Sequence, residues 1–398
     1  MDIKIFPTKL SGEVCAIPSK SQAHRLLICA AFSDAPTKLH CPETNQDIEA
    51  TADCLRALGA SISRINDGYE IVPISSVPDY AVLDCRESGS TLRFLLPIVA
   101  ALGVDTIFCL SGRLHKRPLS PLWEELEANG CCLTRPTENT IRCTGKLQPG
   151  IYTIDGGVSS QFISGLLFAL PLLSGESEIR IVNKLESKPY VSMTQQALAA
   201  FGVVTENYII RPSYPFHSPG SCVVEGDWSN AAFFLTAAAL GNNVHISGLS
   251  ADSSQGDRAI ADILTEISIK QTIDAADIPD LVPILAVAAS AFQGATFTNI
   301  SRLRLKESDR VSAVINMLTS LGASASAEEN VLTVCPGQYH SCTIDAVGDH
   351  RIAMAAAIAA TISDGPITVT GAECVCKSYP SFWDEYKKLG GNYEQYIR

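Results

Sequence analysis

The sequence predicts an α/β protein, and the prediction rests on an internal repeat that contains two kinds of helix. The first half of the repeat is an apolar helical segment, a break and a short strand rich in β-branched residues. The second half is a polar loop, an amphipathic helix and a strand. The repeat recurs six times, and its marks lie roughly 50 to 70 residues apart, the size of a small α/β unit. Strands and helices that alternate in this way are typical of an α/β fold.

The first helix of each copy is apolar nearly all round, so we expect it to be buried. The six apolar segments begin at Leu26, Leu95, Leu166, Phe233, Ile284 and Ile352. The second helix is amphipathic, and in most copies it ends at a glycine that suits a left-handed C-cap. These glycines are Gly59, Gly130, Gly202, Gly322 and Gly390. In the fourth copy the corresponding end lies near Ile267 and has no glycine.

Three copies on each side of a break would give two lobes. The break lies near residues 218–224, after the Pro- and Ser-rich stretch RPSYPFHSPGS. We therefore expect residues 21–224 to form one lobe. Residues 1–20 and 225–398 together would form the other.

Charge and composition narrow the class of protein. The chain has 398 residues and a formal net charge of −12, which argues against nucleic acid as a partner because phosphate backbones call for a basic surface. The amino terminus, MDIKIFPTKL, lacks the basic and apolar regions of a signal peptide. No apolar run reaches the length of a bilayer span. The 14 cysteines show neither a disulfide framework nor zinc-site spacing. We expect a cytoplasmic protein with reduced thiols, no metal site and no membrane partner.

Cationic side chains collect near the predicted helix starts in both lobes. A helix start offers free backbone N–H groups and the positive end of the helix dipole, so it attracts anions. Cations there oppose the electrostatic preference, and that shared departure favours ligand binding. The cations are Lys20, Arg25, Arg117, Arg310, Arg351 and Lys377.

Each polar group also has a plain structural interpretation. Ser21, Ser159 and Asp277 fit simple N-caps. Asp280 fits a residue that complements a helix dipole. The run from Lys306 to Arg310 fits a solvated charged face.

The order of short motifs resembles the 5-enolpyruvylshikimate-3-phosphate (EPSP) synthase family, nearly from end to end. The motifs are SKSQAHR, ESGSTLR, GRLHKRP, SSQ, SKPY, EGDWSNAAFF, DIPD, LKESDR, GDHRIAM and KSYPSF. The resemblance implies a two-lobed inside-out α/β barrel of six βαβαββ copies, three per lobe, with the active site in the cleft between the lobes. It implies transfer of the enolpyruvyl group of phosphoenolpyruvate to the 5-hydroxyl of shikimate 3-phosphate, with release of phosphate.

The resemblance also implies a set of site residues. The shikimate 3-phosphate site would comprise Lys20, Ser21, Arg25, Ser159, Ser160, Gln161, Ser187, Asp280 and Lys306. The phosphoenolpyruvate site would comprise Lys20, Gly89, Arg117, Gln161, Arg310, Arg351 and Lys377. The expected catalytic residues are Lys20, Asp280 and Glu307. No metal or organic cofactor is expected, the two substrates are the expected partners, and we expect a monomer.

The two carboxylates suit the chemistry, since the reaction delivers one proton to C3 of phosphoenolpyruvate and removes another from the hydroxyl. We assign the first task to Glu307 and the second to Asp280, although Lys306 could share either. Two positions depart from many relatives of the family. Glu87 stands where many have an asparagine, and Arg302 stands where some have one, so we place neither in the site.

Two alternative functions remain open on this fold. The sister enzyme that acts on UDP-N-acetylglucosamine uses a cysteine in a mobile loop, whereas the comparable residues 111–117 contain none. A non-catalytic anion-binding protein is the other alternative. The presence of both Asp280 and Glu307 argues against it.

Overall fold

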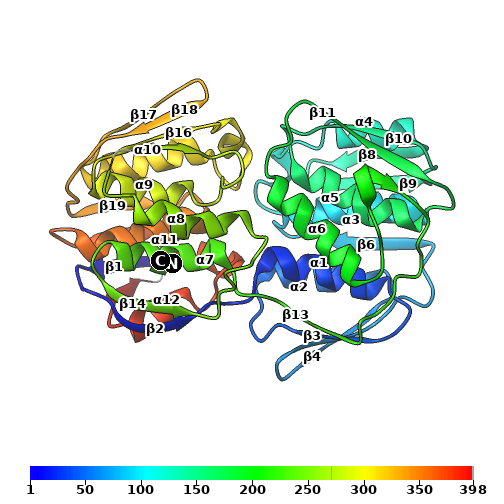
Figure 1. Ribbon diagram of the computed structural model, residues 1–398, viewed down its shortest axis with the longest axis horizontal. Helices are drawn as coiled ribbons and strands as arrows, with labels where there is room; N and C mark the ends of the chain where they lie inside the picture. The colour runs from blue at the N-terminus through cyan, green and yellow to red at the C-terminus, as the bar shows by residue number, and fades with distance from the viewer. Residues whose placement is uncertain (270, 397–398) are drawn as a thin grey trace. The chain divides into compact units, whose positions relative to one another are not determined.

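The chain folds into two units, each built from three sheets and their helices, in this computed structural model, which describes residues 1–269 and 271–396 (Figure 1). One unit comprises Met1–Ile17 and Gly226–Arg398, and the other comprises Pro18–Glu225. The sequence places the first boundary at 20–21. In the structure the two units divide at 17–18, and Ser19 N-caps the helix that begins at Lys20. Among the described residues, every helix is too short or too polar to traverse a lipid bilayer.

The Pro18–Glu225 unit contains three sheets and six α-helices. The first sheet has the strand order β13 (Ser221–Val223), β3 (Thr37–His40), β5 (Gly68–Val72) and β4 (Ser61–Ile65). The second has the order β6 (Tyr80–Asp84), β7 (Asp105–Cys109), β9 (Thr140–Gly145) and β8 (Cys131–Thr137). The third has the order β10 (Ile151–Asp155), β11 (Ser177–Val182) and β12 (Ile209–Ile210). The helices are α1 (Lys20–Ala31), α2 (Gln46–Ala57), α3 (Gly89–Leu102), α4 (Leu122–Ala128), α5 (Ser160–Ala169) and α6 (Lys188–Ala200).

The second unit, Met1–Ile17 with Gly226–Arg398, follows the same plan. One sheet pairs β14 (Asn243–Ser247) with β2 (Ser11–Cys15). Another has the order β15 (Gln271–Asp274), β16 (Ala295–Thr298), β18 (Val331–Val334) and β17 (Ala325–Glu328). The last has the order β19 (Cys342–Asp345), β20 (Ile367–Thr370), β1 (Asp2–Phe6) and β21 (Asn392–Tyr396). The helices are α7 (Trp228–Ala239), α8 (Ile260–Thr265), α9 (Val282–Ala291), α10 (Arg310–Leu321), α11 (His350–Ala359) and α12 (Phe382–Lys388).

Short 3₁₀ helices connect several of these elements. They are η1 (Leu114–Lys116), η2 (Leu170–Leu172), η3 (Glu206–Tyr208), η4 (Gly256–Ala259), η5 (Ser301–Leu305), η6 (Ala360–Ile362) and η7 (Ala372–Lys377).

A complete copy follows the order βαβαββ. In the copy that begins at β6, α3 joins the parallel strands β6 and β7, and β9 of the hairpin β8–β9 pairs antiparallel with β7. The copy that begins at β15 repeats this pattern. In the copy that begins at β19, β19 and β20 are parallel, and β1 and β21 take the place of the hairpin. The α/β class and the repeat predicted from the sequence are therefore both present. The five predicted C-cap glycines, from Gly59 to Gly390, all have positive φ.

Three strands join sheets whose other strands lie far away in the sequence. Strand β13 pairs in parallel with β3, and β2 pairs in parallel with β14. Strand β1 lies between β20 and β21. The last copy is therefore closed by the first strand of the chain.

Two copies are shorter than the βαβαββ pattern predicts. Strand β12 has two residues, and the sheet of β2 and β14 has two strands. Within residues 1–269 and 271–396, no hairpin follows α8, because only a few residues separate its end at Thr265 from β15 at Gln271. This is the copy whose second helix lacks the terminal glycine.

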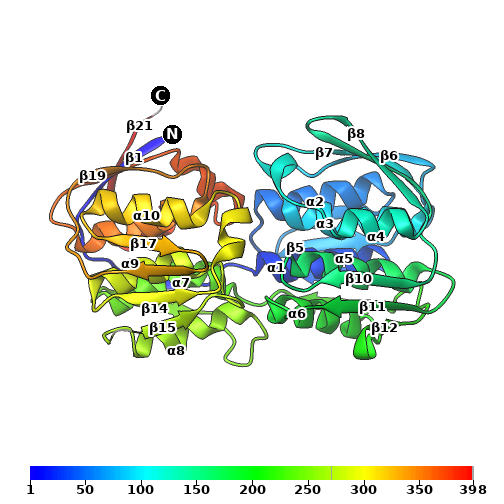
Figure 2. The ribbon, with the colours of Figure 1, turned by 90° about the horizontal axis from the view of Figure 1, so that it is seen from above.

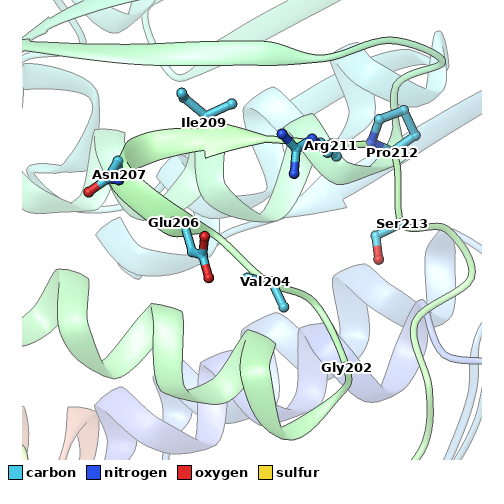
Figure 3. A pocket seen from close by; sticks show the side chains of 8 residues that line it. All are labelled: Gly202, Val204, Glu206, Asn207, Ile209, Arg211, Pro212 and Ser213. Atoms are coloured by element: carbon cyan, nitrogen blue, oxygen red, sulfur yellow. The ribbon is translucent and has the colours of Figure 1, made fainter.

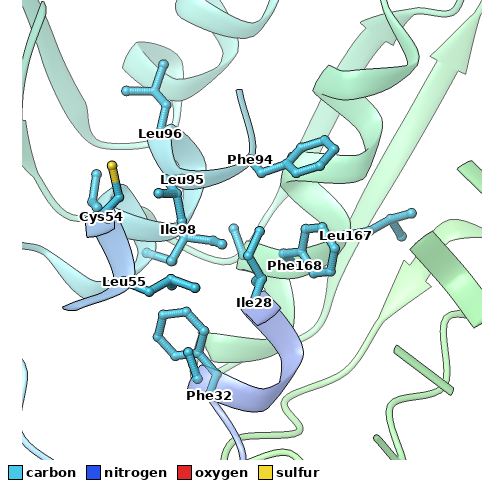
Figure 4. Packing of buried hydrophobic residues seen from close by; sticks show 14 of the residues in the cluster. Ile28, Phe32, Cys54, Leu55, Phe94, Leu95, Leu96, Ile98, Leu167 and Phe168 are labelled. Atoms are coloured by element: carbon cyan, nitrogen blue, oxygen red, sulfur yellow. The ribbon is translucent and has the colours of Figure 1, made fainter. Parts of the chain in front are cut away.

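The apolar helices form the cores, as their composition predicts. Figure 4 shows Ile28 of α1, Phe32 at the C-cap of α1, Leu55 of α2, Ile98 of α3 and Phe168 of α5, all of which are buried in one cluster. Figure 2 shows α3 and α5 between the strands β6–β8 and the strands β10–β12. The two helices pack closely, and this packing fixes the spacing of their N-termini, where the candidate site begins.

A single glycine permits this close approach. A Cβ at Gly165 of α5 would overlap the carbonyl oxygen of Arg93 in α3, and a backbone atom cannot swing aside. We expect Gly165→Ala to lower the free energy of unfolding by about 1–3 kcal/mol, the usual cost of overpacking. Gly150→Ala is the matched control, because the added methyl meets the end of the Asn129 side chain, which can move. Thermal unfolding of both variants tests this, and equal midpoints would contradict it.

Candidate active site

In the Pro18–Glu225 unit, the apolar helices begin with serine N-caps. Ser19, Ser88 and Ser159 accept hydrogen bonds from the backbone N–H groups of Gln22, Thr91 and Gln161. The plain interpretation of Ser159 as a cap is therefore correct. A capping hydroxyl still carries a proton that it can donate to a ligand.

A second group of predicted residues meets at the starts of α3 and α5. The side chain of Gln161 accepts from Arg93 Nη1 at 2.8 Å and donates to Ser90 Oγ at 3.0 Å. The Cα of Gly89 lies against two guanidinium groups, since a Cβ there would be 2.7 Å from Arg117 Nη1 and 2.8 Å from Arg93 Nη1. Gly89, Arg117 and Gln161 are thus brought together. Sequence reasoning missed Arg93, although a cation inside the apolar segment STLRFLL is a visible signal.

The start of α1 carries Lys20 and Arg25. Lys20 Nζ lies 2.9 Å from Asp47 Oδ2 of α2, a partner not predicted from the sequence. The buried guanidinium of Arg25 donates to the carbonyl oxygens of Ser21 at 2.5 Å and Tyr190 at 2.9 Å. Burial lowers the pKa of Arg25 to about 10, and this side chain remains a cation at neutral pH.

Arg25 also ties α1 to the other helices that hold predicted phosphate ligands. Its Nε donates to Thr194 Oγ1 of α6 at 2.8 Å, and Thr194 donates to Ser164 of α5 at 2.8 Å. Ser187 occupies the N-cap position of α6 in a left-handed conformation with φ of 54°. Ser160 and Ser187 are both buried. The predicted residues Ser21, Arg25, Ser160 and Ser187 therefore lie on packed neighbouring elements.

The other unit contains a compact cluster of charged side chains. Arg310, the first residue of α10, lies 2.5 Å from Asp280 Oδ1, 2.6 Å from Glu307 Oε2 and 2.8 Å from Asp349 Oδ2. Lys306 Nζ and Arg351 Nη2 each lie 3.3 Å from a carboxylate oxygen of Asp280. The run from Lys306 to Arg310 is therefore not a solvated face, because the Arg310 side chain is only 1% exposed.

Three predicted residues, Asp277, Arg117 and Lys377, do not lie at the helix starts where the sequence predicts them. Helix α9 begins at Val282 with Leu281 at its N-cap, so Asp277 is not the cap of this helix. Arg117 follows η1, and Lys377 ends η7, so each precedes an α-helix by several residues. Lys377 is buried, and the neighbouring Ser378 donates to Asn230 at the start of α7.

Burial and neighbouring charges shift the pKa values of Asp280 and Lys306. Burial alone would raise the pKa of Asp280, but Arg351, Lys306 and Arg310 outweigh it and hold that pKa well below its usual range. Burial lowers the pKa of Lys306 to about 8, against the opposing pull of Asp280. Asp280 is therefore ionised at neutral pH, and Lys306 titrates within the working range of many enzymes.

Two acidic residues in this unit escaped sequence reasoning. Asp349 is fully buried and N-caps α11, which is the ordinary use of an aspartate at a helix start. Asp257 of η4 is buried, and burial together with the charge of Asp280 raises its pKa to about 6. Neither role is visible in the sequence, because each depends on residues from other copies.

Glu87 and Arg302, the two positions that depart from many relatives of the family, lie in different surroundings. Glu87 is exposed, and its carboxylate lies over the Cα of Gly112. Arg302 is buried in η5, close enough to Lys306 to help lower its pKa.

A surface hollow of about 240 Å³ lies elsewhere in the Pro18–Glu225 unit. Figure 3 shows its lining, which includes Val204, Glu206, Ile209 and Arg211 but none of the predicted site residues. In the part of the chain that the structure describes, no group of three or more His, Cys, Asp or Glu side chains is arranged to hold a metal ion.

Comparison with known proteins identifies the family. Residues 6–386 match the family model described as EPSP synthase (3-phosphoshikimate 1-carboxyvinyltransferase). Proteins named 3-phosphoshikimate 1-carboxyvinyltransferase from Clostridium kluyveri and Clostridium beijerinckii are each 38% identical to this chain and align with 99% of it, covering 98% and 99% of their own lengths.

Solved structures show the same fold. An EPSP synthase from Acinetobacter baumannii has a TM-score of 0.79 at 22% identity, with 99% of this chain and 100% of that one covered. The enolpyruvyl transferase NikO from Streptomyces tendae has a TM-score of 0.77 at 18% identity, with 99% and 98% covered. The family model and the full-length relatives together show that this chain belongs to the EPSP synthase (3-phosphoshikimate 1-carboxyvinyltransferase) family.

Proposed function

We propose that the protein transfers the enolpyruvyl group of phosphoenolpyruvate to the 5-hydroxyl of shikimate 3-phosphate and releases phosphate. This reaction is a step of the shikimate pathway, which supplies aromatic amino acids. The observation that carries the proposal is the contact of Asp280 and Glu307 with the same guanidinium, that of Arg310, beside Lys306. Membership of the family supports it.

The cluster suits proton transfer between two anionic substrates. Two carboxylates in different surroundings can divide the tasks of acid and base. Asp280 lies among three cations that keep it ionised, and an ionised carboxylate is able to accept the hydroxyl proton. Glu307 fits delivery of a proton to C3 of phosphoenolpyruvate. The cations Lys306, Arg310 and Arg351 would bind phosphate and carboxylate groups.

We further propose that the residues that the family resemblance implies bind the two substrates. Shikimate 3-phosphate would contact Lys20, Ser21, Arg25, Ser159, Ser160, Gln161, Ser187, Asp280 and Lys306. Phosphoenolpyruvate would contact Lys20, Gly89, Arg117, Gln161, Arg310, Arg351 and Lys377. The support is that several of these side chains share contacts, as between Lys306 and Asp280 or between Arg310 and Asp280. Gln161 is in turn held by Arg93.

A cytoplasmic location is part of the proposal, as the sequence predicts. A monomeric state and the lack of nucleic-acid and membrane partners stay predictions.

An assay of released phosphate tests the proposed function. Phosphate should appear only when phosphoenolpyruvate and shikimate 3-phosphate are both present. Release with UDP-N-acetylglucosamine in place of shikimate 3-phosphate would assign the protein to the sister reaction. Binding of both substrates without release would indicate a non-catalytic protein.

The two carboxylates should be essential for turnover, whereas amides in their place should still bind shikimate 3-phosphate, because they keep the size and most of the hydrogen bonds. We expect Glu307→Gln and Asp280→Asn each to lose about 10²–10⁴ in rate, the usual cost of removing a positioned acid or base. Incorporation of solvent deuterium into the C3 methylene should fall most in Glu307→Gln. If that variant exchanged deuterium as fast as the parent, Lys306 would become the candidate acid.

Binding of shikimate 3-phosphate should weaken as the pH rises through about 8. The pKa of Lys306 is lowered to about 8, so the cation that pairs with the phosphate is lost above that pH. If the protonated form alone binds, the dissociation constant of the free enzyme should rise toward about tenfold per pH unit. Lys306→Arg, which keeps its charge, should remove this dependence. A flat profile in the parent would show that Lys306 does not bind the phosphate.

A methyl group at Gly89 should act on the donor site through its arginines. The added Cβ would press on the Arg117 and Arg93 guanidinium groups at 2.7 and 2.8 Å. By the resemblance, glyphosate competes with phosphoenolpyruvate at this position. Gly89→Ala should therefore weaken glyphosate more than shikimate 3-phosphate, as measured by inhibition and by direct binding. Equal losses for both ligands would assign Gly89 a purely structural role.

A further inference from the structure

Helices α1 and α2 are joined by two side-chain contacts that lie one helical turn apart. Lys20 Nζ of α1 lies 2.9 Å from Asp47 Oδ2 of α2, and His24 Nδ1 lies 2.7 Å from Thr51 Oγ1. Residues four apart on a helix lie on the same face, so the two contacts follow one another along the pair of helices. The first contact contains Lys20, a predicted phosphoenolpyruvate-binding residue, whereas both residues of the second are 0% exposed.

The buried contact continues from α2 to the start of α3. Thr51 Oγ1 lies 2.7 Å from Thr91 Oγ1, and Thr91 Oγ1 donates to Ser88 Oγ at 2.7 Å. Ser88 caps α3 and is followed by Gly89, whose Cα lies against the guanidinium group of Arg117. Three hydrogen bonds therefore join α1 to a helix start that holds part of the predicted donor site.

This chain of hydrogen bonds lies next to the apolar core of the unit. Ile28, Leu55 and Leu95, which come one helical turn after His24, Thr51 and Thr91, belong to the buried cluster shown in Figure 4. Apolar contact holds the three helices together but has no direction, whereas a hydrogen bond requires a particular alignment of donor and acceptor. The chain is therefore suited to fixing the register of the three helices.

The direction of each hydrogen bond in the chain follows from counting protons. A hydroxyl group carries one proton, and Thr91 gives its proton to Ser88. The proton between Thr51 and Thr91 must therefore come from Thr51, and the proton between Thr51 and His24 must come from His24 Nδ1. With the ring proton on Nε2 instead, Nδ1 would accept from Thr51, and no proton would remain for the contact of Thr51 with Thr91. Within residues 1–269 and 271–396, Nε2 of His24 has no hydrogen-bond partner.

The ring of His24 is neutral, so it carries a single proton. Burial lowers the pKa of His24 to about 3; Asp47 opposes this shift, and the cations Lys20 and Arg25 add to it. Above that pH the ring stays neutral, and its one proton can remain on the nitrogen that faces Thr51. The chain therefore keeps its first donor over the pH range in which most enzymes work.

We propose that His24 is a positioning residue that holds the start of α3 in register with α1 through Thr51 and Thr91. This register places Gly89 where the anionic donor binds, and the same helix α2 also contacts Lys20. The inference rests on the proposed function, because the donor is phosphoenolpyruvate. His24 is 0% exposed and acts only through the chain. Without its N–H group, the hydroxyl of Thr51 can turn to the carbonyl oxygen four residues earlier in α2, and Thr91 then loses its donor.

The position of the ring proton in the unaltered protein is the first test. Long-range ¹H–¹⁵N NMR spectra distinguish a protonated ring nitrogen from a bare one, and the signals of His24 are those that disappear in His24→Leu. We expect a protonated Nδ1 and a bare Nε2 between about pH 6 and about pH 9. A proton on Nε2 would overturn the inference, because the chain would then lack its first donor.

Steady-state kinetics of phosphate release with both substrates is the second test. His24→Leu and Thr51→Val each remove hydrogen-bonding groups with little change in size. We expect each to raise KM for phosphoenolpyruvate about tenfold, which corresponds to about 1.4 kcal/mol of binding. kcat should stay within about twofold, because the group that binds at the start of α3 is anionic in the bound substrate and in the transition state.

Conservative variants of the same two residues should keep the chain intact. The amide of His24→Asn can donate from the place of Nδ1, and Thr51→Ser keeps the hydroxyl group. Both should have a KM for phosphoenolpyruvate within about twofold of the parent value.

Thr106→Val is the matched control outside the chain. Thr106 of β7 is fully buried in the same unit and donates to the carbonyl oxygen of Val104 at 3.1 Å. Its KM for phosphoenolpyruvate should equal that of the parent, whatever the change in unfolding temperature.

An unchanged KM in both His24→Leu and Thr51→Val would overturn the inference. A rise in KM shared by Thr106→Val would overturn it as well, because it would reflect a general loss of stability. If His24→Leu does not fold, the comparison of Thr51→Val with Thr51→Ser decides the question. Absence of phosphate release in the parent would instead reject the proposed function, and the inference would then be judged by the ring proton of His24 alone.

Discussion

The structure depends on enclosing apolar helices whose N-termini still need polar partners. A helix that is apolar on all sides can be buried, but its first N–H groups cannot be left unsatisfied. Side chains cap the starts of α1, α3, α5, α7 and α11, whereas α9 has no side-chain cap. Several of the candidate ligands lie at or near these starts. The constraint that builds the core therefore also shapes the candidate anion-binding site.

The two units meet this constraint with different chemistry. In Pro18–Glu225 the caps of the apolar helices are the neutral serines Ser19, Ser88 and Ser159. In the other unit, Asp227 and Asp349 cap α7 and α11. Serine caps leave the positive potential of a helix start available to an external anion, whereas aspartate caps already neutralise it. One of these aspartate caps, Asp349, also pairs with Arg310.

Sequence reasoning succeeded where a residue's role follows from its neighbours in the chain. The buried helices, the C-cap glycines and the repeat itself all follow from local pattern. The grouping of Asp280, Glu307 and Arg310 in the predicted site came from the family resemblance, and their contact became visible only in the structure. Asp349 and Asp47 were missed, because an aspartate near a helix start is fully explained by capping or by the dipole. Their pairing with Arg310 and Lys20 comes from packing between helices, which no local pattern encodes. The shortened fourth copy left one trace, the missing glycine near Ile267.

The position of β1 has a consequence for how the protein is made. This strand leaves the ribosome long before its two neighbours in the sheet, β20 and β21. The segment Pro18–Glu225 holds all of its own strands and can fold while synthesis continues. The backbone groups of β1 stay unpaired until β20 and β21 have been synthesised. A chain cut short before these strands would therefore leave β1 without partners, and its aggregation would begin there.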